Sequence, residues 1–98
     1  MTQAEDRLHR RNIKHFSEAV EECQAEREWE LTADALYHLV LEYRGKYSDD
    51  KEGKKKFMTL NSDLCDPECL RFAWQAALYW SDPMEAVTRL RKWMEKNL

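Results

Sequence analysis

Both prolines of the chain directly follow an aspartate, at Asp66-Pro67 and Asp82-Pro83. An aspartate side chain accepts hydrogen bonds from the free amides at a helix start, and proline suits the first helical position, where its missing amide hydrogen is not needed. Glu85 follows Asp82 by three residues and gives a capping-box spacing. The two pairs therefore predict helices that begin at residues 67 and 83.

The composition favours helices in the rest of the chain. Only two glycines and two prolines occur in 98 residues, so sharp turns are few. Alanine, leucine, glutamate, lysine, arginine and methionine are abundant, and they lose little rotamer freedom in a helix. No stretch alternates apolar and polar residues for long enough to indicate a strand. Charged residues reach 36%, but aromatic residues at 11% provide too much ring surface for a disordered chain.

Apolar residues recur at steps of three and four residues in the first half of the chain, which places them on one helix face. The first stripe is Ile13, Phe16, Val20 and Cys23, and the second is Leu31, Ala35, Leu39 and Tyr43. The pattern allows one long bent rod, but a rod of over about forty residues covers a core poorly, so we expect a turn between residues 27 and 30. The second helix is expected to end near Gly45, which suits a left-handed C-cap.

The helix that begins at Pro67 is apolar nearly all round, so we expect it to be the central one. Residues 44–56 form a hydrophilic connection, and a helix that begins near Asp49 would bury Phe57, Met58 and Leu60. The overall prediction is a single all-α domain over residues 1–98. Its four main helices lie at about 3–26, 30–45, 67–80 and 83–97, with room for a short extra helix near 50–60.

The sequence excludes several classes of function. A net charge of −3 does not indicate nucleic acid as the partner of the whole surface. No apolar run reaches the roughly 20 residues that span a bilayer, and the acidic N-terminal residues are unlike a secretory signal. Three cysteines do not make a disulfide framework, so we expect a reducing compartment, the cytoplasm.

No pattern indicates catalysis, a cofactor or a metal, and we expect no enzyme. The two glycines are isolated, so no phosphate-binding loop is present. Cys65 and Cys69 lie four residues apart, but a closed zinc site needs two more ligands. Cys69 falls in the first turn of its helix, where the dipole favours a thiolate, although a buried structural cysteine is the commoner case.

A basic segment near the N-terminus provides one binding hypothesis. Arg7, Arg10, Arg11 and Lys14 cluster as phosphate-binding residues do. Acidic residues flank this cluster on both sides, which is more typical of a solvated helix face. A small nucleic-acid-binding regulator is therefore the alternative hypothesis.

The aromatic residues provide the main hypothesis. The four tryptophans and the other aromatic residues have more ring surface than so small a bundle can readily bury. An excess of Trp, Tyr, Met and Arg on helix surfaces is typical of protein interfaces. We expect a helical adaptor, inhibitor or regulatory subunit that binds another protein or a second copy of itself. The expected contact residues are Trp29, Trp74, Trp80 and Trp93, with Arg89 and Lys92 on the rim. The hypothesis fails if the protein encloses every indole ring.

Overall fold

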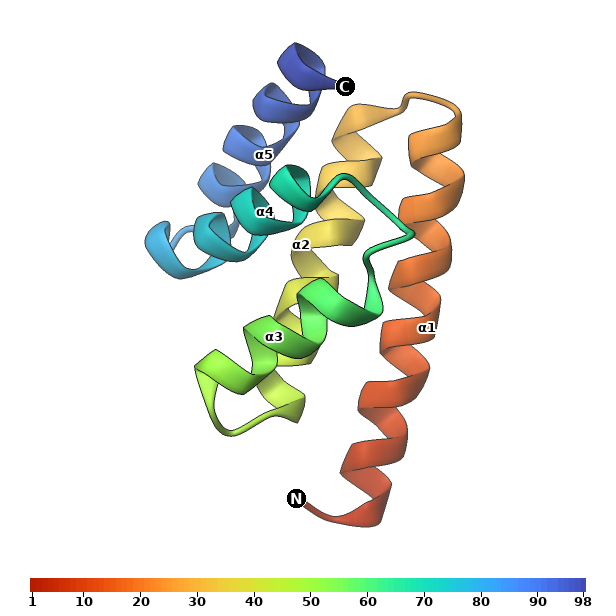
Figure 1. Ribbon diagram of the computed structural model, residues 1–98, viewed down its shortest axis with the longest axis vertical. Coiled ribbons are helices and arrows are strands. Elements are labelled where there is room, and N and C mark those ends of the chain that lie inside the picture. Colours follow the sequence, from red (N-terminus) through yellow and green to blue (C-terminus); the bar gives the residue numbers. More distant parts are fainter.

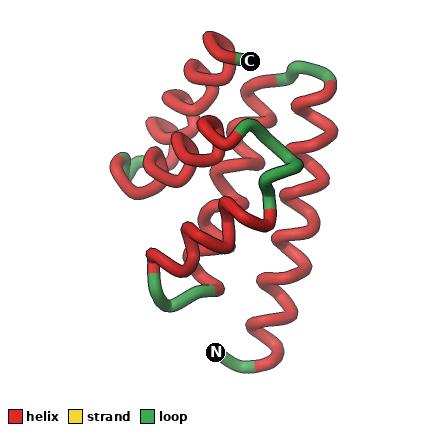
Figure 2. Tube along the Cα trace, viewed as in Figure 1, coloured by secondary structure: helices red, strands yellow, loops and turns green.

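The computed structural model describes residues 1–98 as five α-helices joined by short connections (Figures 1 and 2). The helices are α1 (Gln3–Ala25), α2 (Trp29–Lys46), α3 (Asp50–Leu60), α4 (Pro67–Tyr79) and α5 (Pro83–Asn97). The all-α bundle of four main helices is confirmed, and the short extra helix forms as α3. None of the five helices has both the length and the apolar character needed to cross a membrane.

Side-chain caps begin four of the five helices. The Asp66 carboxylate accepts a hydrogen bond from the Glu68 amide at 2.8 Å, and Asp82 accepts one from Met84 at 3.1 Å. Thr2 caps α1 and Asp49 caps α3 in the same way, whereas Glu28 before α2 makes no side-chain cap. The predicted starts at residues 67 and 83 are confirmed, because these side chains satisfy amides that the helix leaves free.

The chain reverses direction between α1 and α2 without a glycine or a proline. Arg27 takes a left-handed backbone conformation, with φ at 58°. The amides of Arg27 and Glu28 then donate to the carbonyl oxygens of Gln24 and Cys23, at 3.0 and 2.9 Å. These bonds close α1 and allow α2 to return beside it, so residues 3–45 are two helices and not one rod (Figure 1).

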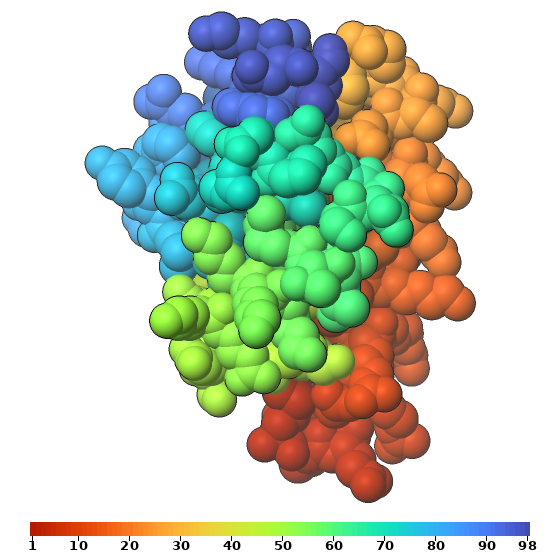
Figure 3. Space-filling view, in the orientation of Figure 1, coloured from red at the N-terminus to blue at the C-terminus, as the bar shows by residue number.

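The central helix is α2, because its backbone approaches all four other helices. The expectation that the helix from Pro67 is central was wrong. Only one side of α4 faces the core, while Leu78 and Tyr79 remain 45% and 80% exposed on its other side. α1 packs against α2 alone among the helices, and its N-terminal end extends beyond the rest of the molecule (Figures 1 and 3).

Two details expected of α2 and α3 were wrong. α2 ends near Gly45 as expected, at Lys46, but Gly45 is not a left-handed C-cap, because no glycine has a positive φ. Gly45 instead makes room for His9 of α1, since a Cβ atom there would lie 2.9 Å from His9 Cε1. In α3, Phe57 is fully buried and Met58 half-buried, but Leu60 is 63% exposed because it lies beside the stripe that faces the core.

Candidate functional site

Four aromatic side chains of α4 and α5 contact one another in series. The rings of Tyr79 and Trp80 have centroids 5.1 Å apart, Trp80 and Phe72 are 6.5 Å apart, and Phe72 stacks on Trp93 at 5.9 Å. We call these four residues the aromatic strip. Such separations are typical of favourable aromatic pairs, so the rings hold one another in place.

The sequence of α4 explains why the strip forms on the surface. The helix buries Leu70, Ala73, Trp74 and Ala77 toward the core. Phe72 and Tyr79 are seven residues apart, which is two helical turns, and so they share another face. After Trp80 the chain turns within Ser81-Asp82, and α5 runs back along α4. This return places Trp93 against Phe72.

The outer end of the strip is the most exposed apolar part of the protein. Tyr79 is 80% exposed, and the neighbouring Leu78 is 45% exposed. The other three rings of the strip are half-buried. A shallow open hollow lies beside them, lined by Phe72, Gln75, Ala76, Leu78, Tyr79 and Trp80. The strip is thus anchored at one end and open to solvent at the other.

The two predicted rim cations lie on α5 and differ in their contacts. The Arg89 guanidinium lies 5.4 Å from the centre of the Trp80 ring, and its Nε donates to Glu85 Oε1 at 2.8 Å. Lys92 is exposed and makes no ion pair. Arg89 therefore helps to hold the Trp80 ring in place, while the Lys92 ammonium group has no charged partner within the chain.

The structure brings Trp80, Trp93 and Arg89 together, but two other predicted contact residues lie elsewhere. Trp74 is only 1% exposed, and its ring packs 5.5 Å from that of Phe57. Its assignment to a partner surface was wrong, because α4 turns this ring into the core. Trp29, at the start of α2, is half-buried under the Arg27 guanidinium at 5.0 Å, and no ring of the strip stacks on it.

Sequence reasoning missed Tyr79 and Met84, the two most exposed of the large apolar side chains at 80% and 78%. Met84 borders a second hollow between α2 and α5, which also includes the 54% exposed Leu31. The seven-residue spacing between Phe72 and Tyr79 could have indicated that Tyr79 is exposed, since both residues lie off the buried stripe of α4. Nothing in the sequence distinguishes Met84 from a core residue of α5.

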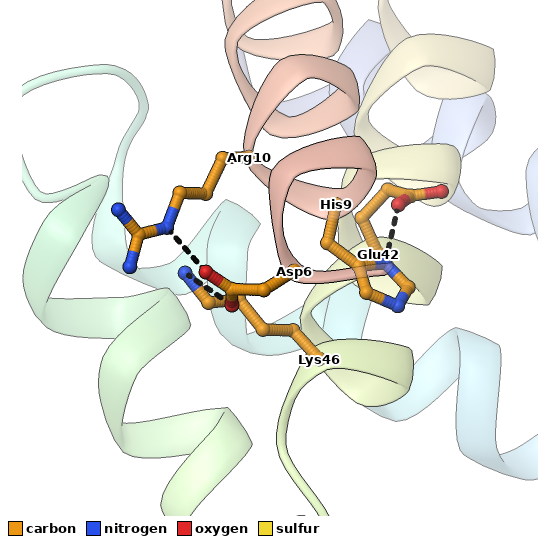
Figure 4. Close-up of polar contacts among 5 residues, drawn as sticks. All are labelled: Asp6, His9, Arg10, Glu42 and Lys46. Carbon is orange, nitrogen blue, oxygen red and sulfur yellow. Dashed lines mark hydrogen bonds and ion pairs between the residues drawn. The ribbon is translucent and has the colours of Figure 1, made fainter. Parts of the chain in front are cut away.

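The four basic residues of the alternative hypothesis share one stripe of α1, at positions i, i+3, i+4 and i+7. Arg10 Nε pairs with Asp6 at 2.8 Å, and Asp6 also lies 3.9 Å from Lys46 Nζ (Figure 4). Arg7, Arg11 and Lys14 are exposed and form no ion pair within the chain. The structure therefore leaves three of the four charges free.

A second polar contact lies beside this stripe and joins α1 to α2. His9 Nδ1 is 2.8 Å from Glu42 Oε1, and both side chains are largely covered, at 24% and 20% exposure (Figure 4). With the contacts of Asp6 it forms a polar clasp, which comprises Asp6, His9, Arg10, Glu42 and Lys46. The clasp joins the outer part of α1 to α2, where α1 buries few residues.

No group of three or more His, Cys, Asp or Glu side chains is placed to hold a metal ion. Comparisons of the chain with protein-family models, curated proteins and solved structures found no match.

Proposed function

We propose that this protein is a non-enzymatic binding protein that contacts another polypeptide through the aromatic strip, with Met84 at the separate α2–α5 hollow as a second exposed apolar contact. The role would be that of an adaptor, an inhibitor or a regulatory subunit. One observation carries the proposal: a continuous series of four contacting rings ends in Tyr79, which is 80% exposed.

The chemistry of the strip supports a protein partner. Tyrosine, tryptophan and arginine are among the residue types enriched at interfaces, and all three occur in the strip and at its rim. Three of the four rings are already held by packing, so a partner would lose little side-chain entropy on ordering them. Covering a ring as exposed as Tyr79 removes on the order of 100 Å² of apolar surface from water, which is worth about 2.5 kcal/mol.

The partner is either a different protein or a second copy of this chain. A single apolar face can pair with itself about a two-fold axis, which gives a homodimer. Sedimentation equilibrium of the pure protein distinguishes the two cases. A cytoplasmic location belongs to the same proposal, and it is supported by the three free thiols, which are typical of a reducing compartment.

Site-specific photo-crosslinking tests the proposal. Benzoylphenylalanine is placed at Tyr79 in one sample and at Leu60 in a matched control, since Leu60 is also exposed, at 63%, but lies on α3. Each protein is irradiated alone and in a lysate of the native host. We expect a discrete adduct from position 79 that unlabelled wild-type protein suppresses and a Tyr79→Ser, Met84→Ser protein does not.

Equal adducts from positions 79 and 60, or suppression by both competitors, would contradict the proposal. An adduct that forms in the pure sample and has twice the mass of the chain identifies a second copy as the partner. An adduct that needs the lysate identifies a different protein.

The alternative function, nucleic-acid binding by Arg7, Arg10, Arg11 and Lys14, is favoured by the three unpaired cations on one stripe of α1. Titration with duplex and single-stranded oligonucleotides at two salt concentrations tests it. Binding that weakens steeply with salt, and is lost in Arg7→Ala with Arg11→Ala, would replace the first proposal. Arg10→Ala is the matched control, because that charge is already paired with Asp6.

A further inference from the structure

The hollow between α2 and α5 combines exposed apolar side chains with carboxylates. Leu31 and Met84 line it and are 54% and 78% exposed, and Val87 adds a half-buried apolar side chain. Glu30 and Asp34 bring two carboxylates to the same lining, which contains no lysine or arginine. A segment that carries both an apolar side chain and free positive charges is therefore complementary to this hollow.

The two carboxylates are available to such a segment. Glu30 is exposed and takes part in no ion pair of the chain. The Asp34 side chain is 58% exposed, and its nearest cationic group is His38, whose Nδ1 lies 3.7 Å from the carboxylate and donates to the Asp34 carbonyl oxygen at 2.8 Å. Seven acidic residues and one basic residue occur over residues 17–34, so the surroundings of the hollow also attract positive charge.

The opposite end of the same chain carries a segment of this kind. In the N-terminal half of α1, Arg7, Arg11 and Lys14 are exposed cations that form no ion pair. Leu8 is 52% exposed and lies one helical turn from Arg11. This end of α1 extends beyond the rest of the molecule, so the other helices do not cover these side chains (Figures 1 and 3).

We propose that the N-terminal half of α1 in one copy of the protein docks in the α2–α5 hollow of a second copy. Leu8 covers the exposed apolar side chains of the hollow, and Arg7 and Arg11 pair with its two carboxylates. Exposed ion pairs add little affinity, so the apolar contact provides most of the attraction. The charges fix the orientation of the docked helix and make the association depend on salt.

The contact joins two different surfaces, so it is heterologous. Each copy keeps one free α1 end and one free hollow, and the assembly continues as an open chain or closes as a ring. A two-fold dimer through the aromatic strip would instead stop at two copies. The assembly goes beyond the binding function proposed for the strip and shares only Met84 with it.

Sedimentation velocity of the pure protein, treated with nuclease so that no nucleic acid bridges two copies, is the first test. At low salt we expect species larger than the monomer whose share grows with protein concentration. High salt should raise the dissociation constant at least about tenfold, because it screens the exposed charges. A protein that stays monomeric at every concentration, or an association that salt does not weaken, would overturn the assignment.

Two variants test whether the two surfaces meet. One is Arg7→Ala with Arg11→Ala, and the other is Leu31→Ser with Met84→Ser. All four side chains are exposed, so both variants should keep the circular dichroism spectrum of the wild type. We expect each variant alone to be monomeric where the wild type associates. Their equimolar mixture should form a dimer and nothing larger, because each variant retains the surface that the other lacks.

Two further variants are controls. Arg10→Ala should associate as the wild type does, because the Arg10 charge is already paired with Asp6. Tyr79→Ser should also associate normally, since the aromatic strip takes no part in the contact. Association lost in Tyr79→Ser, or a mixture that stays monomeric although both variants fold, would overturn the assembly. A monomeric wild type that still crosslinks to another protein from position 79 would overturn the assembly alone and leave the function proposed for the strip intact.

Discussion

The polar clasp between α1 and α2 and the aromatic strip on α4 and α5 use their side chains in opposite ways. In the clasp, every charged group has a partner within the chain, with His9 on Glu42 and Asp6 shared by Arg10 and Lys46 (Figure 4). In the strip, the rings contact one another, but Tyr79 at its end contacts mainly water.

This difference separates what stabilises the molecule from what remains for a partner. The charged groups of the clasp are paired with one another, so the clasp needs no partner to explain it, although its more exposed pair, Arg10 with Asp6, adds little stability. Exposed ring surface is different, because leaving it in water forgoes about 25 cal/mol for each Å². The strip is then explained most simply by an association that covers it, whereas the clasp is explained by the fold alone.

The first and largest predicted effect concerns the tryptophan that the fold encloses. Trp74→Ala should reduce the free energy of unfolding by about 3 to 5 kcal/mol, because it removes a fully buried ring and leaves a cavity beside Phe57. Urea denaturation followed by circular dichroism measures this loss. A change below about 1 kcal/mol would mean that Trp74 is not part of the core and could face a partner after all.

The clasp should have a smaller effect on stability. A double-mutant cycle with His9→Ala and Glu42→Ala should give a coupling of about 1 kcal/mol, since the contact is short and mostly shielded from water. The same cycle on Arg10 and Asp6 is the control and should give less than about 0.5 kcal/mol, because Arg10 is 69% exposed. Equal couplings would show that burial does not distinguish these two contacts.

Gly45 tests whether the clasp also constrains the backbone. In a helix, Gly→Ala normally stabilises by roughly 0.5 to 1 kcal/mol, but here the added methyl group would meet His9 at 2.9 Å. We expect Gly45→Ala to leave the free energy of unfolding nearly unchanged, and the same substitution in a His9→Ala background to show the normal gain. A full gain in the wild-type background would mean that His9 moves aside at no cost.

The sequence predicted the parts of the fold that depend on local chemistry. The starts of α4 and α5 follow from Asp-Pro pairs whose side chains cap them, and the all-α class follows from composition and periodicity. The role of Gly45 was not predictable, because this residue makes room for His9, 36 residues away, and does not cap its own helix. A local sequence pattern does not predict contacts between residues that lie far apart in the chain.

The candidate surface was only partly predictable for the same reason. Composition indicated more aromatic surface than the bundle hides, and Trp80, Trp93 and Arg89 do lie together. Which ring becomes core depends on how α4 rotates against α2 and α3. In this protein the rotation of α4 buries Trp74 and exposes Tyr79. Helical periodicity cannot predict the rotation of a helix that is apolar on both sides.

The smallest predicted effect on stability is the sharpest test of the comparison. Tyr79→Ser should change the free energy of unfolding by less than about 0.5 kcal/mol, because the side chain is 80% exposed and loses only its edge contact with Trp80. Leu60→Ser, at 63% exposed on α3, is the matched control and should be equally neutral.

The two variants should differ only in association, where Tyr79→Ser weakens partner binding by more than about 1 kcal/mol and Leu60→Ser does not. Titration of the partner that crosslinks at position 79 measures this difference. If Tyr79→Ser unfolds the protein as Trp74→Ala does, the strip belongs to the core, and the contrast with the clasp disappears.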